Sequence, residues 1–275
     1  MTGRIAEAFR RDGFYFPVPL ITETEASALA AEVRRYEAIT RKAGGRLGRR
    51  WNSPKIHLLA PWADKLVRDE RILAVVEDLI GPDLLVWSTH LFWRRGRSSD
   101  ELAWHQDALH YGWEGFQHRT VRIWLALTET TRVNGTMRFA RGPHNQTLVP
   151  HRRSSSAKGI FRGLEVDLDI DHDTVVDVLL RPGEGSLHHG SAVHSSGPSS
   201  TDADRICFAV DYITPEVKPK PGPDTAMLVR GRDTTGFYLL DEPPSQEFAP
   251  EAIRRFNWSV EVRDRRFLAV MGREA

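Results

Sequence analysis

Short segments of alternating side chains, each bounded by turn-forming residues, are the feature that most constrains the fold of this chain. The clearest is 205–213, where large apolar residues alternate with small ones such as Cys207 and Ala209. A helical lead followed by about eight such strands predicts a mainly β fold with flanking helices, in which two facing sheets form a jelly roll around one cavity. The other expected strands cover residues 84–93, 102–107, 120–128, 136–140, 174–180 and 185–189.

The first third of the chain is predicted to be helical. Residues 22–25 (Thr-Glu-Thr-Glu) have the spacing of a capping box and open an amphipathic run to about Ile39. A second helix is expected from near Asp69 to Gly81, and a last short one from Pro250 to Arg255. We therefore expect a single domain over residues 1–275, with a helical part at about 1–82, a jelly-roll core at about 83–214 and a C-terminal extension at about 215–275.

Composition limits the classes of function. The chain has 38 basic and 37 acidic residues, so its formal charge of +1 supplies no net field that would recruit nucleic acid or an anionic membrane. Cys207 is the single cysteine, so no disulfide framework exists and a reducing cytoplasm fits. The first residues lack the apolar run of a signal, and no stretch approaches membrane-spanning length. We expect a cytoplasmic protein that binds a small molecule, and the sequence indicates no oligomeric state.

A histidine and an aspartate stand two residues apart in Trp-His-Gln-Asp, at the end of an expected strand. Because side chains alternate along a strand, His105 and Asp107 should point the same way. An imidazole and a carboxylate so placed can occupy adjacent positions around one metal ion, as in the two-histidine, one-carboxylate sites of non-haem Fe(II) oxygenases. By itself the spacing is weak evidence, since a chain with 11 histidines yields roughly one such match by chance.

A third metal ligand must come from another segment, and His188, His189 and His194 all lie close together. Residues 195–204 are turn formers apart from one alanine, so the strands on either side are expected to form a hairpin. His194 and Arg205 would then stand side by side at its open end. An iron oxygenase that uses 2-oxoglutarate needs a cation there, and a guanidinium binds a carboxylate through two charge-assisted hydrogen bonds. This placement favours His194 over the other two histidines.

Taken together, these residues resemble the phytanoyl-CoA dioxygenase family of Fe(II)/2-oxoglutarate oxygenases. The family pattern is H-x-D, then H-x-S, then an arginine eleven residues after the second histidine, and the likeness covers about residues 8–215. The resemblance implies a cupin-like, double-stranded β-helix core that uses Fe(II), 2-oxoglutarate and O2. It assigns the metal to His105, Asp107 and His194, and the cosubstrate to Arg205, Ser196 and Lys55.

The resemblance also implies the reaction, a 2-oxoglutarate-dependent dioxygenase reaction that oxidises a C–H bond and releases succinate and CO2. Halogenating relatives replace the carboxylate ligand with a small residue, so Asp107 favours hydroxylation, with desaturation or oxidative ring closure as further outcomes. Natural-product tailoring is expected over fatty acyl oxidation, because the aromatic and arginine residues that could line the cavity suit a polar or ring-shaped metabolite. Substrate contacts are expected from His110, Tyr111, Trp113, Arg230 and Asp233.

Two other classes of protein remain open at this point. A cupin-like metal-dependent isomerase or dioxygenase that needs no 2-oxoglutarate would use the same histidines, but it would leave Arg205 unexplained. A non-catalytic jelly-roll binding protein would leave all three metal ligands unexplained. Turnover of 2-oxoglutarate separates both classes from the oxygenase.

Overall fold

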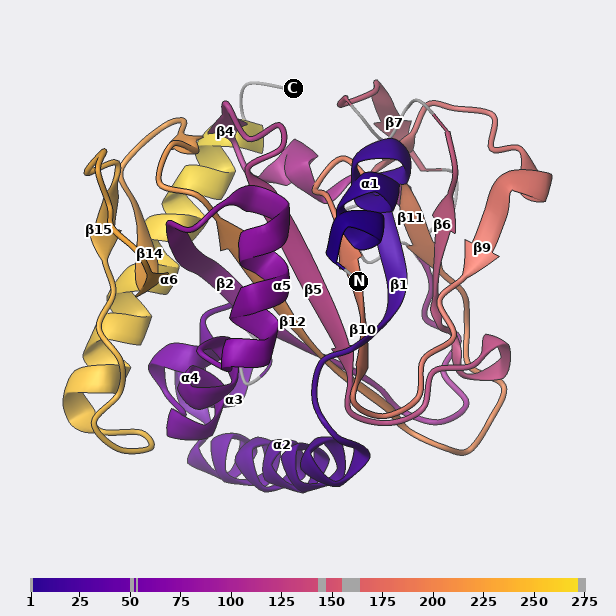
Figure 1. Ribbon diagram of the computed structural model, residues 1–275. Coiled ribbons are helices and arrows are strands. Elements are labelled where there is room, and N and C mark those ends of the chain that lie inside the picture. The colour runs from indigo at the N-terminus through magenta and orange to yellow at the C-terminus, as the bar shows by residue number, and fades with distance from the viewer. Residues whose placement is uncertain (1, 50–51, 53, 143–146, 155–163, 272–275) are drawn as a thin grey trace.

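The central feature of the fold is a pair of facing β-sheets (Figure 1). The computed structural model describes residues 2–49, 52, 54–142, 147–154 and 164–271. The larger sheet contains, in spatial order, β1 (Phe14–Pro19), β10 (Glu184–His188), β5 (Thr120–Ala126), β12 (Arg205–Ile213), β2 (Leu84–Arg94), β14 (Asp224–Arg230) and β15 (Tyr238–Leu240). The smaller sheet contains β3 (Leu102–His105), β11 (His194–Ser196), β6 (Met137–Ala140) and β9 (Val175–Asp177). These sheets form the expected jelly roll.

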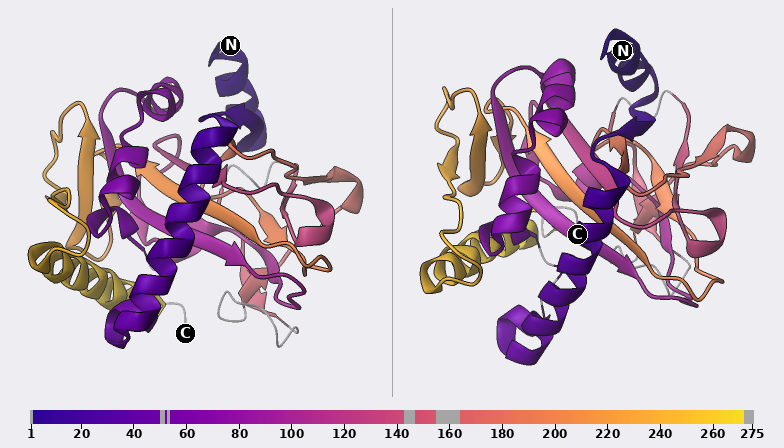
Figure 2. Two further views of the ribbon diagram at one scale, coloured as in Figure 1. Left: turned by 90° about the horizontal axis from the view of Figure 1, so that it is seen from below. Right: turned by 60° about the horizontal axis from the view of Figure 1, so that its bottom comes forward.

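Two short strand pairs and a set of helices surround the sheets. The pairs are β4 (Trp113–Glu114) with β13 (Lys218–Pro219) and β7 (His151–Arg153) with β8 (Leu164–Val166). The helices are α1 (Thr2–Asp12), α2 (Glu23–Ala43), α3 (Gly45–Arg49), α4 (Pro61–Val67), α5 (Glu70–Ile80) and α6 (Pro250–Met271). Figure 2 shows α2 crossing the larger sheet on its outer side.

The alternation of β12 divides its side chains between two cores, as the sequence predicted. Phe208 and Val210 point outward and belong to the same apolar cluster as Val76 of α5. Cys207 and Ala209 point inward and belong to the cluster between the two sheets. Because the inward residues are small, they leave room for a cavity at the centre of the fold.

One expected connection was wrong. Residues 195–204 do not join the two arms of a hairpin, because β11 pairs with β3 and β6 in the smaller sheet whereas β12 pairs with β2 and β5 in the larger one. The segment crosses from one sheet to the other instead. His194 and Arg205 therefore reach the same cavity from opposite sheets.

The last helix is longer than expected. It continues beyond Arg255 because Phe256 and Val260 extend a fully buried face that packs near β14. In Figure 1 α6 lies beside β14 and β15, at the opposite side of the molecule from β9. This helix brings the C-terminal extension against the core.

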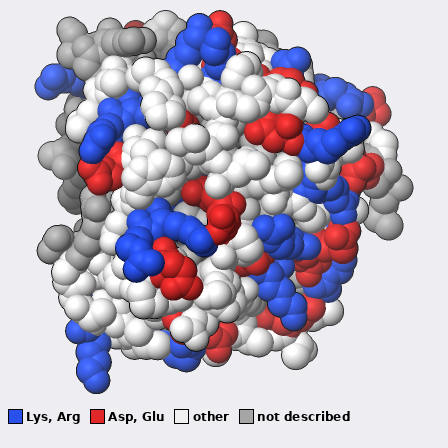
Figure 3. Space-filling model, turned by 90° about the vertical axis from the view of Figure 1, so that its left-hand side faces the viewer, with Lys and Arg blue, Asp and Glu red and all other residues white. Residues whose placement is uncertain are grey.

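No described helix combines the length and apolar composition that a bilayer-spanning segment requires. On the face shown in Figure 3, basic and acidic side chains of the described residues are interspersed rather than separated. This mixture follows from the nearly equal numbers of the two charge types in the chain.

The capping box at the start of α2 provides a test of local stability. The Thr22 hydroxyl accepts a hydrogen bond from the Glu25 backbone N–H, and the Glu25 carboxylate accepts one from the Thr22 N–H at 2.7 Å. Replacing Thr22 with alanine is expected to lower the free energy of unfolding by about 1 kcal/mol, because the first bond is lost. Urea unfolding followed by circular dichroism measures the change. Thr24→Ala, at an exposed helical position, is the control, and an equal loss in both variants would contradict the capping role.

Candidate active site

Three side chains that can bind a metal converge between the sheets. One nitrogen each of His105 and His194 and one carboxylate oxygen of Asp107 all lie within 4.8 Å of one another. All three residues are buried. Strands β3 and β11 pair with His105 opposite His194, so the register of the smaller sheet sets the two imidazoles side by side. The structure thus brings together the three residues that the sequence had singled out.

The backbone reaches Asp107 in a different way from the one expected. β3 ends at His105, and Asp107 is the first residue of a short 3-10 helix rather than part of the strand. Gln106 between them has extended dihedral angles (φ −121°, ψ 124°), so the two side chains still point to the same side. The buried Gln106 amide donates to the carbonyl oxygens of Thr147 and Ser191, which fixes this bend.

Backbone carbonyl groups determine which ring nitrogen of each histidine faces the site. His105 Nδ1 lies 2.7 Å from the Ala103 carbonyl oxygen, and His194 Nδ1 lies 2.9 Å from that of Ala192. A carbonyl oxygen only accepts, so Nδ1 carries the proton and Nε2 keeps a lone pair for a metal. Burial holds the pKa of His194 well below its usual value, so this ring stays neutral at pH 7.

Arg122 orients the third candidate ligand. Its guanidinium donates to Asp107 Oδ2 at 2.5 Å and binds both carboxylate oxygens of Asp211. Burial alone would raise the pKa of Asp107, but the positive charge of Arg122 holds it well below the usual range. Asp107 therefore remains a carboxylate, with one oxygen engaged by Arg122 and the other available to a metal.

Two buried arginines lie near the metal residues without an acidic partner. Arg94 and Arg205 are 8% and 5% exposed, and neither forms an ion pair with a carboxylate in the described part of the chain. Arg94 donates to the Ser196 hydroxyl at 3.2 Å, whereas Arg205 donates to the Gly135 carbonyl and lies over the Trp124 ring. Burial and the charge of Arg205 lower the pKa of Arg94 to about 10. Two desolvated positive charges favour an anionic ligand.

One cavity connects Arg205 to the metal residues, and Arg94 lies behind the Ser196 hydroxyl in its wall. Its walls include all three metal candidates together with Ser196 and Arg205. The Nε groups of Arg94 and Arg205 are buried with no hydrogen-bond partner in the described structure. Buried donors in native proteins are nearly always satisfied by protein, water or ligand, so this cavity is suited to a ligand that accepts hydrogen bonds.

The structure does not bring three of the expected ligand contacts to the metal residues. Lys55 is fully buried and pairs with Asp241 at 2.5 Å, Arg230 pairs with Glu77 of α5 at 2.5 Å, and Asp233 accepts hydrogen bonds from the backbone of its own turn. Each of these charged groups therefore already has a partner within the fold. None of the three residues lines the cavity of the metal residues or the cavity beside it.

A second cavity, of about 200 Å³, adjoins the first at Asp107 and Arg122. Two of the expected substrate contacts, His110 and Tyr111, line it. The third, Trp113, lies outside this lining and packs on the Trp87 ring with a centroid separation of 4.6 Å. The space for a substrate thus begins directly beside the metal residues.

The opposite wall of the second cavity was missed in the sequence. It consists of Arg263, Arg266 and Phe267 from α6, beyond the point where this helix was expected to end. The spacing from Val260 to Arg263 and on to Phe267 continues one helical face, and this was the signal that could have located the wall.

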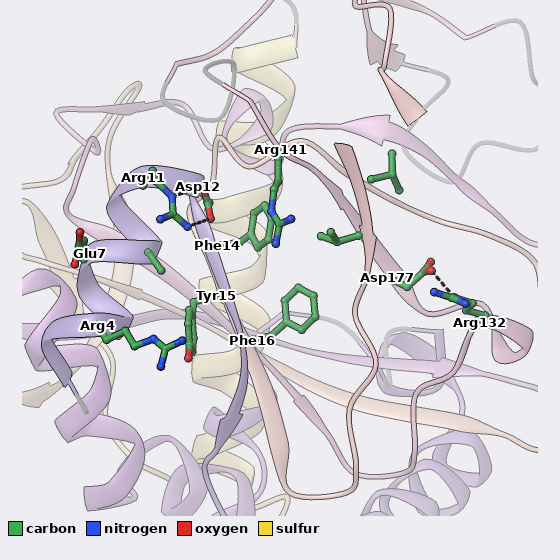
Figure 4. Close-up of a pocket in the computed structure, with 13 residues that line it drawn as sticks. Arg4, Glu7, Arg11, Asp12, Phe14, Tyr15, Phe16, Arg132, Arg141 and Asp177 are labelled. Carbon is green, nitrogen blue, oxygen red and sulfur yellow. Dashed lines mark hydrogen bonds and ion pairs between the residues drawn. The ribbon is translucent and has the colours of Figure 1, made fainter. Parts of the chain in front are cut away.

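A larger hollow, of about 700 Å³, is separate from both cavities (Figure 4). It lies beside α1 and β1. In its lining, Arg11 forms an ion pair with Asp12, with 2.7 Å between a guanidinium nitrogen and a carboxylate oxygen. Phe14 in its lining stacks on Phe139, and Phe139 packs against the His194 ring, with centroid separations of 4.3 and 5.9 Å. Two aromatic rings therefore stand between this hollow and the metal residues.

Comparison with known proteins agrees with the site. A solved structure described as a non-heme monooxygenase, ThoJ in its apo form, is 46% identical, with a TM-score of 0.91 and coverage of 98% of this chain and 99% of that one. A structure of the ThoJ–Ni complex is 44% identical, with a TM-score of 0.86 and coverage of 97% and 99%.

Curated relatives are more distant. A probable alpha-ketoglutarate-dependent hypophosphite dioxygenase of Stutzerimonas stutzeri is 26% identical over 205 residues, which cover 72% of this chain and 70% of the relative. An ectoine dioxygenase of Bordetella parapertussis is 27% identical over 152 residues, 51% of this chain and 48% of the relative, so the chain spans about half the length of that protein. The pattern of the family described as phytanoyl-CoA dioxygenase (PhyH) matches residues 9–207. With this match and its His-Asp-His site, the chain belongs to the phytanoyl-CoA dioxygenase family of Fe(II)/2-oxoglutarate-dependent dioxygenases.

Proposed function

We propose that this protein uses Fe(II), 2-oxoglutarate and O2 to oxidise a C–H bond of a small metabolite in natural-product tailoring. Hydroxylation is the default outcome, with desaturation and ring closure as variants. The observation that carries the proposal is a single cavity in which the buried Arg205, which forms no ion pair with a carboxylate of the described residues, lies beside three side chains able to bind one metal. Similarity over almost the whole chain to a protein described as a non-heme monooxygenase supports the oxidation of a C–H bond.

The donor set fits Fe(II). His105 and His194 would hold the metal through neutral Nε2 atoms, and Asp107 would hold it through one carboxylate oxygen, a combination typical of non-haem oxygenases. Arg122 keeps the Asp107 carboxylate ionised and fixes its orientation through the hydrogen bond to Oδ2. When bound together with 2-oxoglutarate and O2, the metal supplies the oxidising power, while the protein orients the reactants and excludes water.

The buried arginines suit the far carboxylate of 2-oxoglutarate. Arg205, with Ser196 beside Arg94, offers a guanidinium fork and a hydroxyl in the wall of the cavity that also contains the three metal residues. A carboxylate that accepts two hydrogen bonds from Arg205 would satisfy its buried Nε donor and offset the positive charge of its guanidinium. A metal enzyme that does not use 2-oxoglutarate would leave these donors without a partner.

The substrate would occupy the second cavity. At about 200 Å³ it is smaller than the roughly 300–1,000 Å³ typical of sites for drug-sized ligands. Trp87, Phe92 and Phe267 line much of it, which keeps water from the reacting bond. Its size favours a small metabolite, or one group of a larger molecule, over a long acyl chain.

A turnover assay tests the proposal. The purified protein, given Fe(II), O2 and labelled 2-oxoglutarate, is expected to form labelled succinate slowly even without substrate. Removal of metal by a chelator is expected to stop the reaction, because the protein side chains cannot activate O2 without it. Added Fe(II) is expected to restore the reaction. Succinate is measured by chromatography, with an anaerobic sample as the control. A protein that binds iron but neither binds nor consumes 2-oxoglutarate would contradict the proposal.

A further inference from the structure

We propose that Arg263 of α6 makes the second cavity a binding site for a small ring compound that carries a carboxylate. The inference rests on the proposed function and deepens it, because it names the chemical class of the substrate. Neither the family match, which ends at residue 207, nor the described names of the relatives assigns a role to this helix. The argument starts from the charges that line the cavity.

Three arginines line the second cavity, and two of them are neutralised by the protein itself. Arg122 pairs with Asp107 at 2.5 Å, and Arg266 pairs with the fully buried Asp224. Arg263 forms no ion pair with a carboxylate of the described residues. Arg122 also pairs with Asp211, whose charge acts on Arg263 from a greater distance, so Arg263 is the arginine of this cavity whose N–H groups no carboxylate of the described residues engages.

Arg263 is held in one orientation by neighbours that do not remove its charge. Its guanidinium carbon lies 4.2 Å from the centroid of the Trp87 ring, and one of its N–H groups donates to the Ser88 hydroxyl at 2.5 Å. A guanidinium has five N–H donors, so several remain. Burial lowers the pKa of Arg263, although the charges of Asp211 and Asp224 act in the opposite direction. A carboxylate in the cavity could accept two parallel hydrogen bonds from these remaining donors.

The rest of the lining is suited to a flat ring. Trp87, Phe92, Tyr111 and Phe267 supply aromatic surface around a space of about 200 Å³. Aromatic side chains pack well against other planar groups through offset or edge-to-face contacts. A neutral ring would use this surface but leave the guanidinium unsatisfied, and a cationic one would be repelled by Arg263.

The wall that carries Arg263 is fixed in place. On the same helix, Arg266 donates to the backbone carbonyls of Tyr111 and Gly112 in addition to its pair with Asp224. These contacts tie α6 to the loop that follows Asp107. A ring whose carboxylate binds Arg263 would therefore extend from this wall toward Asp107, at the boundary with the metal cavity.

Calorimetric titration of the protein loaded with Ni(II) and 2-oxoglutarate tests this inference, because the cosubstrate then fills the Arg205 subsite. The probes are benzoate, benzamide and benzylamine, which share a ring and differ in charge. Benzoate is expected to bind about 10-fold more tightly than either of the others. Arg263→Gln is expected to abolish this preference. Arg265→Gln, at an exposed position of the same helix that pairs with Glu261, is the matched control and should leave benzoate binding unchanged.

Several outcomes would overturn the inference. These are benzoate affinity that is the same in Arg263→Gln as in the wild type, equal binding of the three probes, or tighter binding of benzylamine. Arg263→Met keeps the side-chain stem over Trp87 and serves as a second variant if glutamine disturbs folding. The loading step separates two kinds of failure. A protein that does not take up metal and 2-oxoglutarate contradicts the proposed function, whereas one that takes up both but lacks the Arg263-dependent preference contradicts this inference alone.

Discussion

Replacing His105 with alanine is expected to abolish 2-oxoglutarate turnover and to weaken metal binding more than roughly 100-fold. Partners outside the ligand set already contribute about 10- to 100-fold to metal affinity, and His105 would be a ligand itself. Its Nε2 is the nitrogen that faces the other two metal candidates, because Nδ1 donates to the Ala103 carbonyl. Titration with Fe(II) under anaerobic conditions and the succinate assay measure the two effects.

His151→Ala is a matched control for the His105 variant. Its Nδ1 lies 2.9 Å from the carbonyl oxygen of Val149, two residues earlier, which is the same arrangement as in His105. His151 is half-buried and lies outside the cavity of the metal residues. The control should keep metal binding and turnover. If both variants lost activity equally, the loss would reflect damage to the fold, and the ligand role of His105 would be contradicted.

Replacing Arg205 with methionine is expected to raise the KM for 2-oxoglutarate about 10- to 100-fold, because hydrogen bonds to a charged group are lost. The free energy of unfolding without cosubstrate is expected to stay within about 1 kcal/mol of the wild type. Removing a desolvated, unpaired charge is favourable and offsets the lost bond to Gly135. Kinetics at varied 2-oxoglutarate and urea unfolding give the two quantities.

The two measurements on Arg205 distinguish ligand binding from a structural role. 2-Oxoglutarate should raise the unfolding temperature of the metal-loaded wild type, since a ligand that binds the folded state stabilises it, and should have much less effect on the variant. Arg205→Lys keeps the charge but loses the bidentate fork, so its KM should fall between those of the wild type and Arg205→Met. A large loss of stability with an unchanged KM would show that Arg205 acts only as a structural residue.

Much of the fold and of the metal site could be predicted because local spacing encodes it. The alternation in 205–213 placed Cys207 and Ala209 inside before any partner strand was known. The capping box fixed the start of α2 in the same way. His105, Asp107 and Ser196 were singled out through short motifs whose members lie two residues apart in the sequence.

What could not be predicted depends on contacts between distant segments. The turn-forming composition of 195–204 indicates that the chain changes direction, but not that it passes into another sheet. Lys55 is a plausible anion ligand in the sequence, yet its charge is used by Asp241, 186 residues later. The wall of the second cavity depends on Arg266 meeting Asp224, a pairing across 42 residues. No local pattern contains such information.

The position of α6 has a consequence for how relatives of this protein can diverge. The three metal candidates and Arg205 all lie within the stretch that matches the family, 9–207, whereas the helix that closes the second cavity lies outside it. Under the proposed function, the iron chemistry would thus depend on the matched stretch, whereas this helix would supply one wall of the substrate site. Exchange of the C-terminal segment between relatives could redirect the oxidation to a new molecule while the iron centre stays intact, so this helix is a natural starting point for recombination and enzyme design.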